Sequence, residues 1–363
     1  MSAVRVYNFS SGPAVMPLEV IEEAAAELTD WQGSGMSVME VSHRGKAFVA
    51  CAAETEAHLR SVMGVPDDYA VLFLQGGATG QFAAVPLNLT KPGDTIDVLH
   101  TGQWSAKAIS EAKKYGIDVR VVTDEKASNY TTTPAAGSYE LNPGAKYVHY
   151  TPNETIGGVA FHYIPETGDV PLVADMSSMI MSAPIDVTKF GLIYAGTQKN
   201  MGPAGMCVVI VRRDLMGHAR PETPTIVEYS GMAANDSMLN TPPTFGIYLL
   251  GKILKWVESK GGVEGIAAVN RAKAAALYDF IDGSDFYSNP VAKDSRSIMN
   301  VTFVLADSEL DKKFVAEAEA AGLTNLAGHR SVGGMRASIY NAMPREGVDA
   351  LIAFMDAFAA ANG

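Results

Sequence analysis

Apolar residues follow two different periods along the chain, and these two patterns alternate through its first two thirds. They recur at helical spacing over 18–31 and 47–63, which predicts two amphipathic helices. Short continuous apolar runs indicate strands that are buried on both faces. The expected strands are 70–74, 95–99, 118–122, 147–150, 172–174, 192–195 and 206–211, with a further helix at 104–115. This alternation predicts an α/β domain with a mostly parallel sheet.

The last hundred residues have a different pattern, which predicts a smaller α+β domain at the C-terminus. Long helices are expected at 245–260 and 263–282, and Gly261-Gly262 separates them. The elements expected after them are strand 299–305, helix 310–321, strand 335–339 and helix 348–360. We therefore divide the chain into an N-terminal arm (1–17), a large domain (18–260) and a small C-terminal domain (261–363).

Composition removes several classes of function. The chain has 363 residues, 47% of them hydrophobic, and a formal net charge of −12, which disfavours nucleic acid as a partner. The sequence contains neither a polybasic patch nor an apolar run long enough to span a membrane, so we expect no membrane contact. Cys51 and Cys207 do not form a disulfide framework, so a reducing compartment is expected. With no signal peptide visible at the N-terminus, the sequence predicts a cytoplasmic protein.

A lysine follows one of the predicted strands, at the end where parallel sheets form their ligand sites. The run 192–195 leads into small residues and then Lys199, and Gly202–Gly205 allows close approach of a cofactor. A desolvated lysine has a lowered pKa and can attack an aldehyde. An isolated lysine in a loop is usually a surface residue, so the prediction depends on its neighbours. With them, Lys199 is our candidate for the Schiff-base lysine of a pyridoxal-phosphate enzyme.

A carboxylate ends the preceding apolar run. Asp175 follows 172–174 and by itself could simply cap the next segment. Paired with Lys199 it has a chemical role, because pyridoxal phosphate needs a carboxylate that keeps its ring nitrogen protonated. Neighbouring strand ends lie about 5 Å apart. Lys199 and Asp175 are therefore predicted to serve opposite parts of one ring.

A glycine turn offers donors for the cofactor's phosphate. Residues 74–81 read LQGGATGQ, a strand followed by a glycine turn and a helix start, where backbone N–H groups bind anions. The turn does not match the dinucleotide pattern GxGxxG. Trp104 opens the helix after the next strand, where it would stack on the cofactor ring unless it is a core aromatic. Thr155 follows strand 147–150 and would donate to the ring's phenolic oxygen or orient Asp175.

Seven segments make the chain resemble the phosphoserine aminotransferases. They are NFSSGP (8–13), VSHRG (41–45), QFAAVP (81–86), PNETI (152–156), AGTQKN (195–200), NTPPT (240–244) and GGMRASIYN (333–341). The resemblance spans almost the whole chain. It implies fold type I of the pyridoxal-phosphate enzymes and a homodimer with a large cofactor domain and a small C-terminal domain.

The resemblance also implies roles for individual residues, with no metal among the ligands. Lys199 and Asp175 would be the catalytic pair. The cofactor contacts that it implies are Ala78, Thr79, Trp104, Thr155, Gln198 and, reaching the other subunit's cofactor phosphate, Asn240 and Thr241. The substrate contacts that it implies are Ser11, His43, Arg44, His329, Arg330 and, for the α-carboxylate, Arg336.

The substrate residues fit ligands that carry an anion at each end, because arginine binds such groups bidentately. One departure from the family pattern concerns the distal anion. Many bacterial relatives have Gly-Arg after the Gly-Gly turn, where this chain has Ala78-Thr79. Recognition of the substrate's phosphate would then depend on Arg44, Arg330 and the histidines beside them.

The expected reaction is reversible amino transfer between L-glutamate and 3-phosphohydroxypyruvate, giving 2-oxoglutarate and O-phospho-L-serine. Use of a second phosphorylated substrate from pyridoxine biosynthesis, 4-phosphohydroxy-L-threonine, stays open. The alternatives are another fold-type I enzyme, such as an alanine–glyoxylate aminotransferase or a cysteine desulfurase, a nicotinamide-dependent oxidoreductase, and a non-catalytic binding protein. A cysteine desulfurase would need a mobile reactive cysteine, and an oxidoreductase would need a dinucleotide fingerprint. A non-catalytic binding protein would be expected to have lost Lys199 or Asp175.

Overall fold

A seven-stranded sheet forms the centre of the computed structural model, which describes residues 5–363. The strand order is β2-β10-β9-β8-β5-β3-β4. Their bounds are β2 (Tyr69–Gln75), β3 (Thr95–His100), β4 (Asp118–Asp124), β5 (Val148–Tyr150), β8 (Leu172–Asp175), β9 (Leu192–Gly196) and β10 (Met206–Arg212). β10 runs antiparallel to β2 and β9, whereas the other neighbouring pairs are parallel. The predicted mostly parallel sheet is confirmed.

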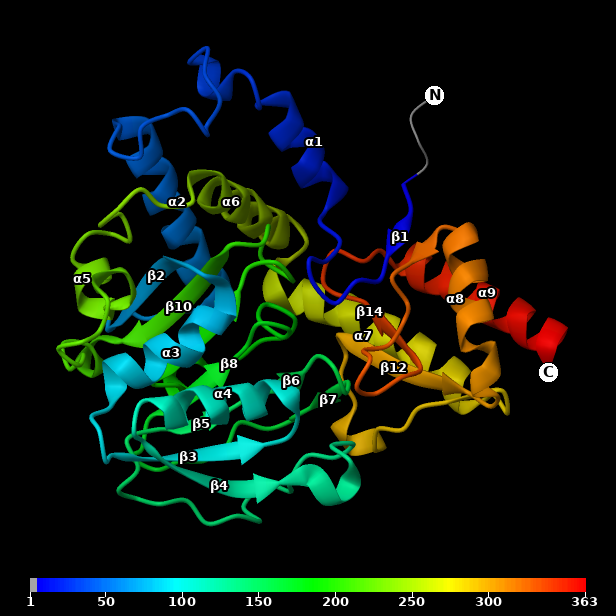
Figure 1. The fold of residues 1–363 in the computed structure, drawn as a ribbon. Helices are drawn as coiled ribbons and strands as arrows, with labels where there is room; N and C mark the ends of the chain where they lie inside the picture. Colours follow the sequence, from blue (N-terminus) through cyan, green and yellow to red (C-terminus); the bar gives the residue numbers. More distant parts are fainter. Residues whose placement is uncertain (1–4) are drawn as a thin grey trace.

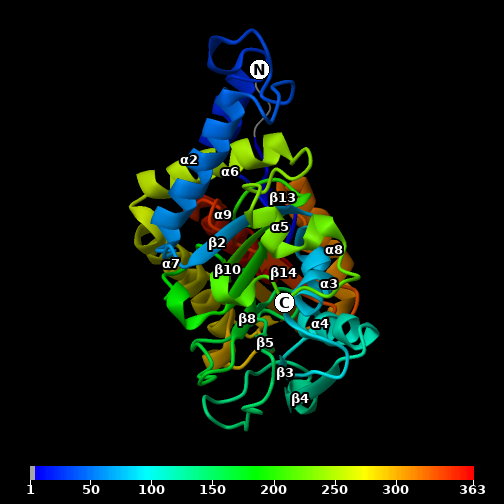
Figure 2. The same ribbon diagram turned by 90° about the vertical axis from the view of Figure 1, so that its left-hand side faces the viewer.

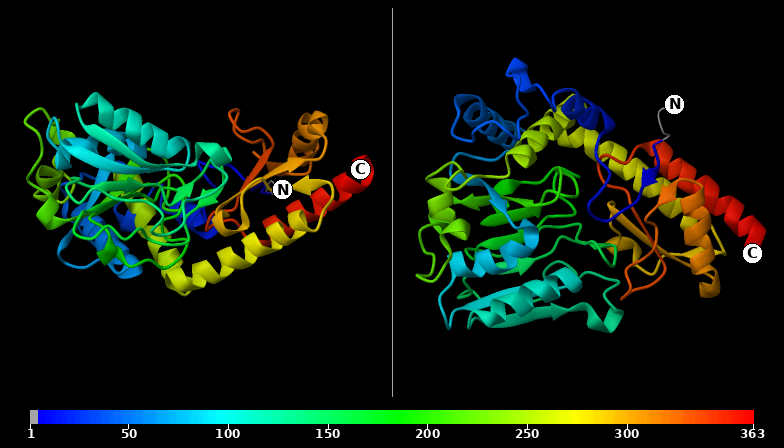
Figure 3. Two further views of the ribbon diagram at one scale, coloured as in Figure 1. Left: turned by 90° about the horizontal axis from the view of Figure 1, so that it is seen from below. Right: turned by 45° about the horizontal axis from the view of Figure 1, so that its top comes forward.

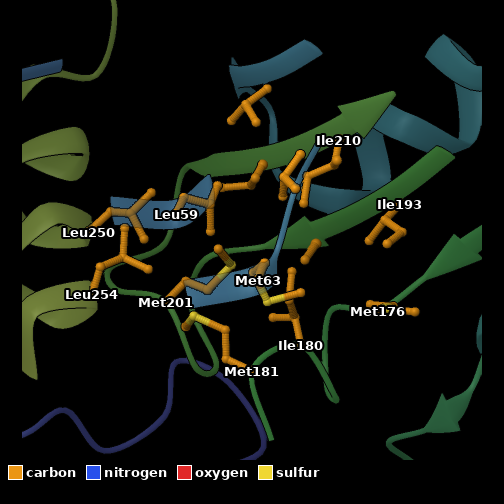
Figure 4. Close-up of a cluster of buried hydrophobic side chains, with 14 of the residues drawn as sticks. Leu59, Met63, Met176, Ile180, Met181, Ile193, Met201, Ile210, Leu250 and Leu254 are labelled. Carbon is orange, nitrogen blue, oxygen red and sulfur yellow. The ribbon is translucent and has the colours of Figure 1, made fainter. Parts of the chain in front are cut away.

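Helices cover both faces of this sheet. Figure 2 shows the sheet between α2 and α6 on one side and α3 and α4 on the other. The helices of this part are α1 (Leu18–Ala26), α2 (Lys46–Met63), α3 (Gly77–Leu89), α4 (Gln103–Lys114), α5 (Tyr229–Ala233) and α6 (Thr244–Ser259). Neighbouring residues of β9 point to opposite faces, so Ile193 packs in the core under α2 and α6, and Tyr194 in the core under α3. Figure 4 shows the first of these cores, where Leu59, Leu250 and Leu254 face the strands.

The C-terminal part has its own sheet and its own core. Its elements are α7 (Gly262–Asp282), β11 (Tyr287–Ser288), β12 (Asn300–Leu305), α8 (Asp311–Ala320), β13 (Leu323–Thr324), β14 (Met335–Ser338) and α9 (Arg345–Asn362). β11, β12 and β14 form an antiparallel sheet. The N-terminal arm joins this part, because β1 (Tyr7–Asn8) pairs with β13 and Phe9 is buried in the same core (Figure 1).

Helix α7 connects the two parts, as the view from below in Figure 3 shows. Its first turns pack in the large core through Val263 and Ile266, and its later turns pack in the C-terminal core through Ala274 and Leu277. The helix lies entirely after the predicted boundary, yet its first turns belong to the large core. The division at residue 260 stays a prediction.

Some elements differ from the sequence-based expectation. The first helix ends at Ala26 instead of continuing to Trp31, and a 3-10 turn follows in which Gln32 has a positive φ of 56°. Asp30 closes this turn by accepting a hydrogen bond from the Gly35 N–H (2.7 Å). The short hairpin of β6 (Asn153–Glu154) and β7 (Val159–Ala160) was not expected, because strands of two residues show no periodicity.

The remaining regular elements are 3-10 turns: η1 (Trp31–Gly33), η2 (Glu125–Ser128), η3 (Val187–Lys189), η4 (Arg213–Leu215), η5 (Thr225–Val227), η6 (Lys293–Ser295) and η7 (Ser308–Leu310). Within residues 5–363, none of the helices is both long enough and apolar enough to cross a membrane.

Candidate active site

A cavity of about 260 Å³ lies at the carboxyl ends of the central strands. Seven of the residues predicted for the cofactor line it: Ala78, Thr79, Trp104, Thr155, Asp175, Gln198 and Lys199. They come from the starts of α3 and α4, from the last residue of β8 and from the segments after β6 and β9. The sheet order explains why Asp175 and Lys199 lie in one cavity. β8 and β9 are neighbours, and Asp175 pairs with Tyr194, five residues before Lys199. The predicted clustering of these residues is observed.

The amine of Lys199 is held inside this cavity. Its Nζ donates a hydrogen bond to Thr155 Oγ1 (2.8 Å) and lies 5.6 Å from the centroid of the Trp104 ring. Burial lowers the pKa of Lys199 to about 8, and the positive charge of Arg336 acts in the same direction. The negative charges of Asp175 and Glu154 oppose this shift. A lysine in this setting is a far better nucleophile at neutral pH than an exposed one.

The carboxylate of Asp175 is fixed by Ser177. Both the N–H (3.0 Å) and the hydroxyl (2.6 Å) of Ser177 donate to Asp175 Oδ1, and the same hydroxyl oxygen accepts from the Gly196 N–H (3.1 Å). Burial raises the pKa of Asp175, whereas the hydrogen bonds from Ser177 and the charge of Lys199 lower it. Within residues 5–363, Oδ2 of this carboxylate receives no hydrogen bond, which leaves it available to a ligand in the cavity.

The start of α3 supplies anion donors to the same cavity. Gly76 caps the helix with a φ of 92°, and Gly77 follows with a φ of 63°, a backbone region that glycine adopts without strain. The N–H groups of Gly77, Ala78 and Thr79 belong to the first helical turn, where no intrahelical acceptor exists. They lie at the positive end of the helix dipole, so an anionic group is stabilised there.

Arg336 lies on β14 beside the cavity. Its guanidinium donates from Nη2 to Ser11 Oγ (2.8 Å), and its Nε is buried without a partner in the described chain. Tyr340 fixes the arm by donating from its hydroxyl to the Ser11 carbonyl (2.9 Å). Ser11 and Arg336, 325 residues apart, are thus brought together as predicted. The unpartnered Nε offers a donor to an incoming carboxylate.

The loop before β14 carries His329 and Arg330. His329 Nδ1 is hydrogen-bonded to Ser331 Oγ (2.7 Å), and Ser331 Oγ also accepts from Gln103 Nε2 at the start of α4. Burial and the nearby positive charges of Arg336, Arg330 and Lys107 lower the pKa of His329. The loop is therefore tied to the helix that carries Trp104.

Ser11, Arg336, His329 and Arg330 do not line this cavity, and neither do four further predicted residues from two other segments of the chain. His43 and Arg44 precede α2, and Asn240 and Thr241 precede α6. Arg44 and Thr241 are exposed, and the buried Nε2 of His43 and Oδ1 of Asn240 have no partner within residues 5–363. The structure of one chain does not bring these four residues to Lys199.

The two cysteines are placed away from the cavity. Cys207 is fully buried in β10, Cys51 is half-buried in α2, and both are free. Burial raises the pKa of each thiol, which disfavours the reactive thiolate. Within residues 5–363, no cluster of three or more acidic, histidine or cysteine side chains could hold a metal ion.

Comparison with known proteins identifies the family. The family model described as aminotransferase class-V matches residues 6–351. The chain is 56% identical to the phosphoserine aminotransferase of Hahella chejuensis over 99% of both chains. It superposes on the solved structure of phosphoserine aminotransferase from Bacillus circulans subsp. alkalophilus with a TM-score of 0.97, at 50% identity and 99% coverage of each chain.

The chain belongs to the phosphoserine aminotransferases. A PLP-bound phosphoserine aminotransferase from Trichomonas vaginalis is also similar, with a TM-score of 0.93, 43% identity and coverage of 97% of this chain and 100% of that one. The resemblance inferred from the seven sequence segments and the α/β fold class are confirmed.

Several polar residues of the phosphoserine aminotransferase site were missed by the sequence reasoning. Ser177 had one usable signal, because a serine two residues after an aspartate can hydrogen-bond back to it. Glu154 and Ser331 had none, since their partners lie 49 and 228 residues away along the chain. Such pairings depend on the tertiary fold and leave no local pattern.

Proposed function

We propose that this enzyme transfers an amino group reversibly between L-glutamate and 3-phosphohydroxypyruvate, giving 2-oxoglutarate and O-phospho-L-serine, with pyridoxal phosphate as cofactor. The observation that carries this proposal is the pairing of Lys199 and Asp175 across one cavity in a member of this family. O-phospho-L-serine and L-glutamate both carry an α-carboxylate and a distal anion. One site with donors for two anions can therefore serve both half-reactions.

The residues present fit the cofactor. Trp104 Nε1 is buried without a partner in the described chain, so its ring has a polar edge that a ligand can satisfy. The first turn of α3 offers three free N–H groups to a phosphate, and Gln198 lines the cavity beside them. Asp175 Oδ2 is available to a protonated ring nitrogen. Bound there, pyridoxal phosphate supplies an electron-withdrawing ring that stabilises negative charge at the substrate's α-carbon.

Lys199 acts as the proton carrier of the reaction. Its neutral amine accepts the proton from the α-carbon of the amino acid, and its ammonium form returns a proton in the reverse direction. The pKa of about 8 suits this task, because both forms of the amine are populated near neutral pH. Thr155 Oγ1 holds the amine at one place in the cavity, and Asp175 keeps a negative charge opposite it.

Substrate anions are bound at the two ends of the site. Arg336, held by Ser11, binds the α-carboxylate through its unpartnered Nε and the adjacent Nη2. His329 and Arg330 bind the distal phosphate or carboxylate from the loop that Gln103 and Ser331 hold. Thr79 carries no charge, so this loop supplies more of the distal recognition here.

A second copy of the chain completes the site in this proposal. Asn240 and Thr241 would reach the partner's cofactor phosphate, and His43 and Arg44 the partner's substrate. Exposed apolar side chains around the same segments support a covered surface here: Leu18, Ile21, Leu28, Met36, Met39 and Val49. We therefore propose a homodimer with two shared sites.

Mixing two inactive variants tests the shared site. Lys199→Ala abolishes turnover in its own site, and Asn240→Ala weakens binding of the cofactor in the partner's site. After co-refolding, a hybrid dimer has one site with both changes and one with neither, so activity should return to at most about one quarter of the wild-type level. Mixtures no more active than the sum of the two variants would refute the sharing.

The reaction itself is tested on the purified enzyme. The protein should bind pyridoxal phosphate with a visible absorption band that O-phospho-L-serine bleaches much faster than unphosphorylated L-serine or L-alanine does. Lys199→Ala should abolish turnover. Equal bleaching by all three amino acids would contradict the specificity, and bleaching by L-alanine alone, with glyoxylate as the acceptor, would favour the alanine–glyoxylate alternative.

We also propose that the enzyme works in the cytoplasm. The two free cysteines support this proposal, because a reducing compartment keeps such thiols unpaired.

A further inference from the structure

A buried glutamate caps the helix that carries Trp104. The Glu154 side chain is 1% exposed, and its carboxylate accepts from the backbone N–H groups of Trp104 (2.9 Å) and Ser105 (2.9 Å). The Ser105 hydroxyl donates to the same carboxylate at 2.7 Å. These contacts satisfy first-turn donors of α4 with a side chain from the hairpin strand β6. A long-range contact thus replaces the usual local cap.

The surroundings are shaped for this carboxylate. A Cβ at Gly102 would lie 2.5 Å from Glu154 Cδ, so only glycine leaves room for the side chain. The N–H groups of Thr101 (3.1 Å) and Gly102 (3.0 Å) donate to Ser105 Oγ, which orders the chain around the contact. The Glu154 carboxylate acts only as an acceptor in these hydrogen bonds, so they favour its ionised form. Burial opposes them and raises the pKa of Glu154.

The first turn of α4 joins two parts of the site. Trp104 lines the cavity next to Lys199, and its neighbour Gln103 donates to Ser331 in the loop that carries His329 and Arg330. A shift of this turn would therefore move the aromatic wall of the cavity and the distal-anion loop together. Glu154 is the side chain that holds the turn.

We propose that Glu154 is a positioning residue for this reaction: it places the Trp104 ring against the cofactor and, through Gln103 and Ser331, places His329 and Arg330 for the distal anion. The inference rests on the proposed roles of Lys199, Trp104 and the loop. It adds a residue that touches neither the cofactor nor the substrate.

Glu154 also acts on the protonation of Lys199. Burial and Arg336 lower the pKa of this lysine, whereas Asp175 and Glu154 raise it. The negative charge of Asp175 also raises the pKa of Glu154. Removing the negative charge of Glu154 should therefore lower the pKa of the group at Lys199, in addition to loosening the turn.

Glu154→Gln tests both effects in the holoenzyme. Two quantities are measured: the pH midpoint of the bound cofactor's visible absorption band, and the KM for O-phospho-L-serine against kcat. We expect the midpoint to fall by about half a pH unit and KM to rise about tenfold. Glu154→Asp, which keeps the charge, should return the midpoint towards the wild-type value.

Two further variants separate the effects. Ser331→Ala should raise KM and leave the midpoint unchanged, because it releases the loop without removing a charge. Glu111→Gln removes a carboxylate farther along α4, where Glu111 pairs with Lys114 (2.6 Å) at the surface, and should change neither quantity. A Glu154→Gln enzyme that loses thermal stability but keeps the wild-type midpoint and KM would overturn the proposal.

Gly102→Ala provides a second perturbation if Glu154→Gln does not fold. It displaces the carboxylate without discharging it, so KM should rise while the midpoint stays near the wild-type value; an unchanged KM would overturn the proposal. Failure of the proposed function would look different from failure of the Glu154 proposal. In that case the wild-type enzyme itself would show no visible absorption band, or its band would not respond to O-phospho-L-serine.

Discussion

The reactivity of Lys199 towards an aldehyde gives the sharpest test of the site's electrostatics. Only the neutral amine reacts, so the rate follows the fraction that is unprotonated. Burial lowers the pKa of Lys199 to about 8, which leaves roughly one molecule in ten neutral at pH 7. An exposed lysine with the usual pKa near 10.5 would be neutral in roughly one molecule in three thousand. The cavity should therefore accelerate the reaction at pH 7 by roughly 300-fold over an exposed lysine.

The pH profile can be measured on cofactor-free enzyme. Pyridoxal phosphate is mixed with the protein between pH 6 and pH 10, the product is trapped early with borohydride, and the labelled peptide is quantified by mass spectrometry. The rate at Lys199 should rise with a midpoint near pH 8. A rate at Lys199 that still rises steeply at pH 10 without levelling off would refute the role that burial has in this reasoning.

The sign of the neighbouring charges gives an internal check. Asp175→Asn removes a negative charge that stabilises the ammonium form, so it should lower the midpoint. Arg336→Gln removes a positive charge that destabilises it and should raise the midpoint. Shifts in the same direction for both variants would mean that charge does not control the amine.

Three other substitutions have expected outcomes. Arg336→Gln should raise the KM for L-glutamate and O-phospho-L-serine about 100-fold in steady-state assays, because a charge-assisted contact to the α-carboxylate is lost. The control Arg345→Gln, at an exposed residue that pairs with Asp349, should leave both KM values unchanged. Thr79→Arg should lower the KM for O-phospho-L-serine several-fold with little change in kcat, and an unchanged KM would mean that the loop alone recognises the phosphate. Burial lowers the pKa of Lys273 to about 7. Between pH 7 and about 10.4 the unfolded state therefore binds more protons than the folded state. The free energy of unfolding should rise over this range by up to about 1.4 kcal/mol per pH unit. Urea unfolding of Lys273→Met should lack this contribution, and equal slopes in both proteins would contradict it.

Much of the fold was predictable because its signals are local. The strands β2, β3, β8, β9 and β10 are continuous apolar runs that end in glycine or polar residues, and each lies within two residues of its expected bounds. Lys199 and Asp175 follow two neighbouring strands, so the sheet rule alone brings them together. The start of α3 was readable in the same way, from a glycine pair after a strand.

The rest of the site depends on contacts that sequence patterns do not encode. Glu154 reads as one more polar residue in a loop, and its partners at the start of α4 become visible only in the fold. The first helix was predicted five residues too long, because Leu28 and Trp31 continue the apolar spacing past its true end. The roles of His43 and Asn240 rest on the proposed homodimer and remain predictions.

The N-terminal arm shows how tightly the site is tied to both parts of the molecule. The Ala14 N–H donates to the carbonyl of Gln198 (2.8 Å), next to Lys199, while Ser11 holds Arg336 of the C-terminal sheet. The arm is itself anchored by Phe9, which is fully buried in the C-terminal core. Lys199 and Arg336, the proposed proton carrier and the proposed α-carboxylate ligand, are therefore set relative to each other by the N-terminal arm. A change in how the arm packs should alter substrate alignment even where Lys199 and Arg336 are intact.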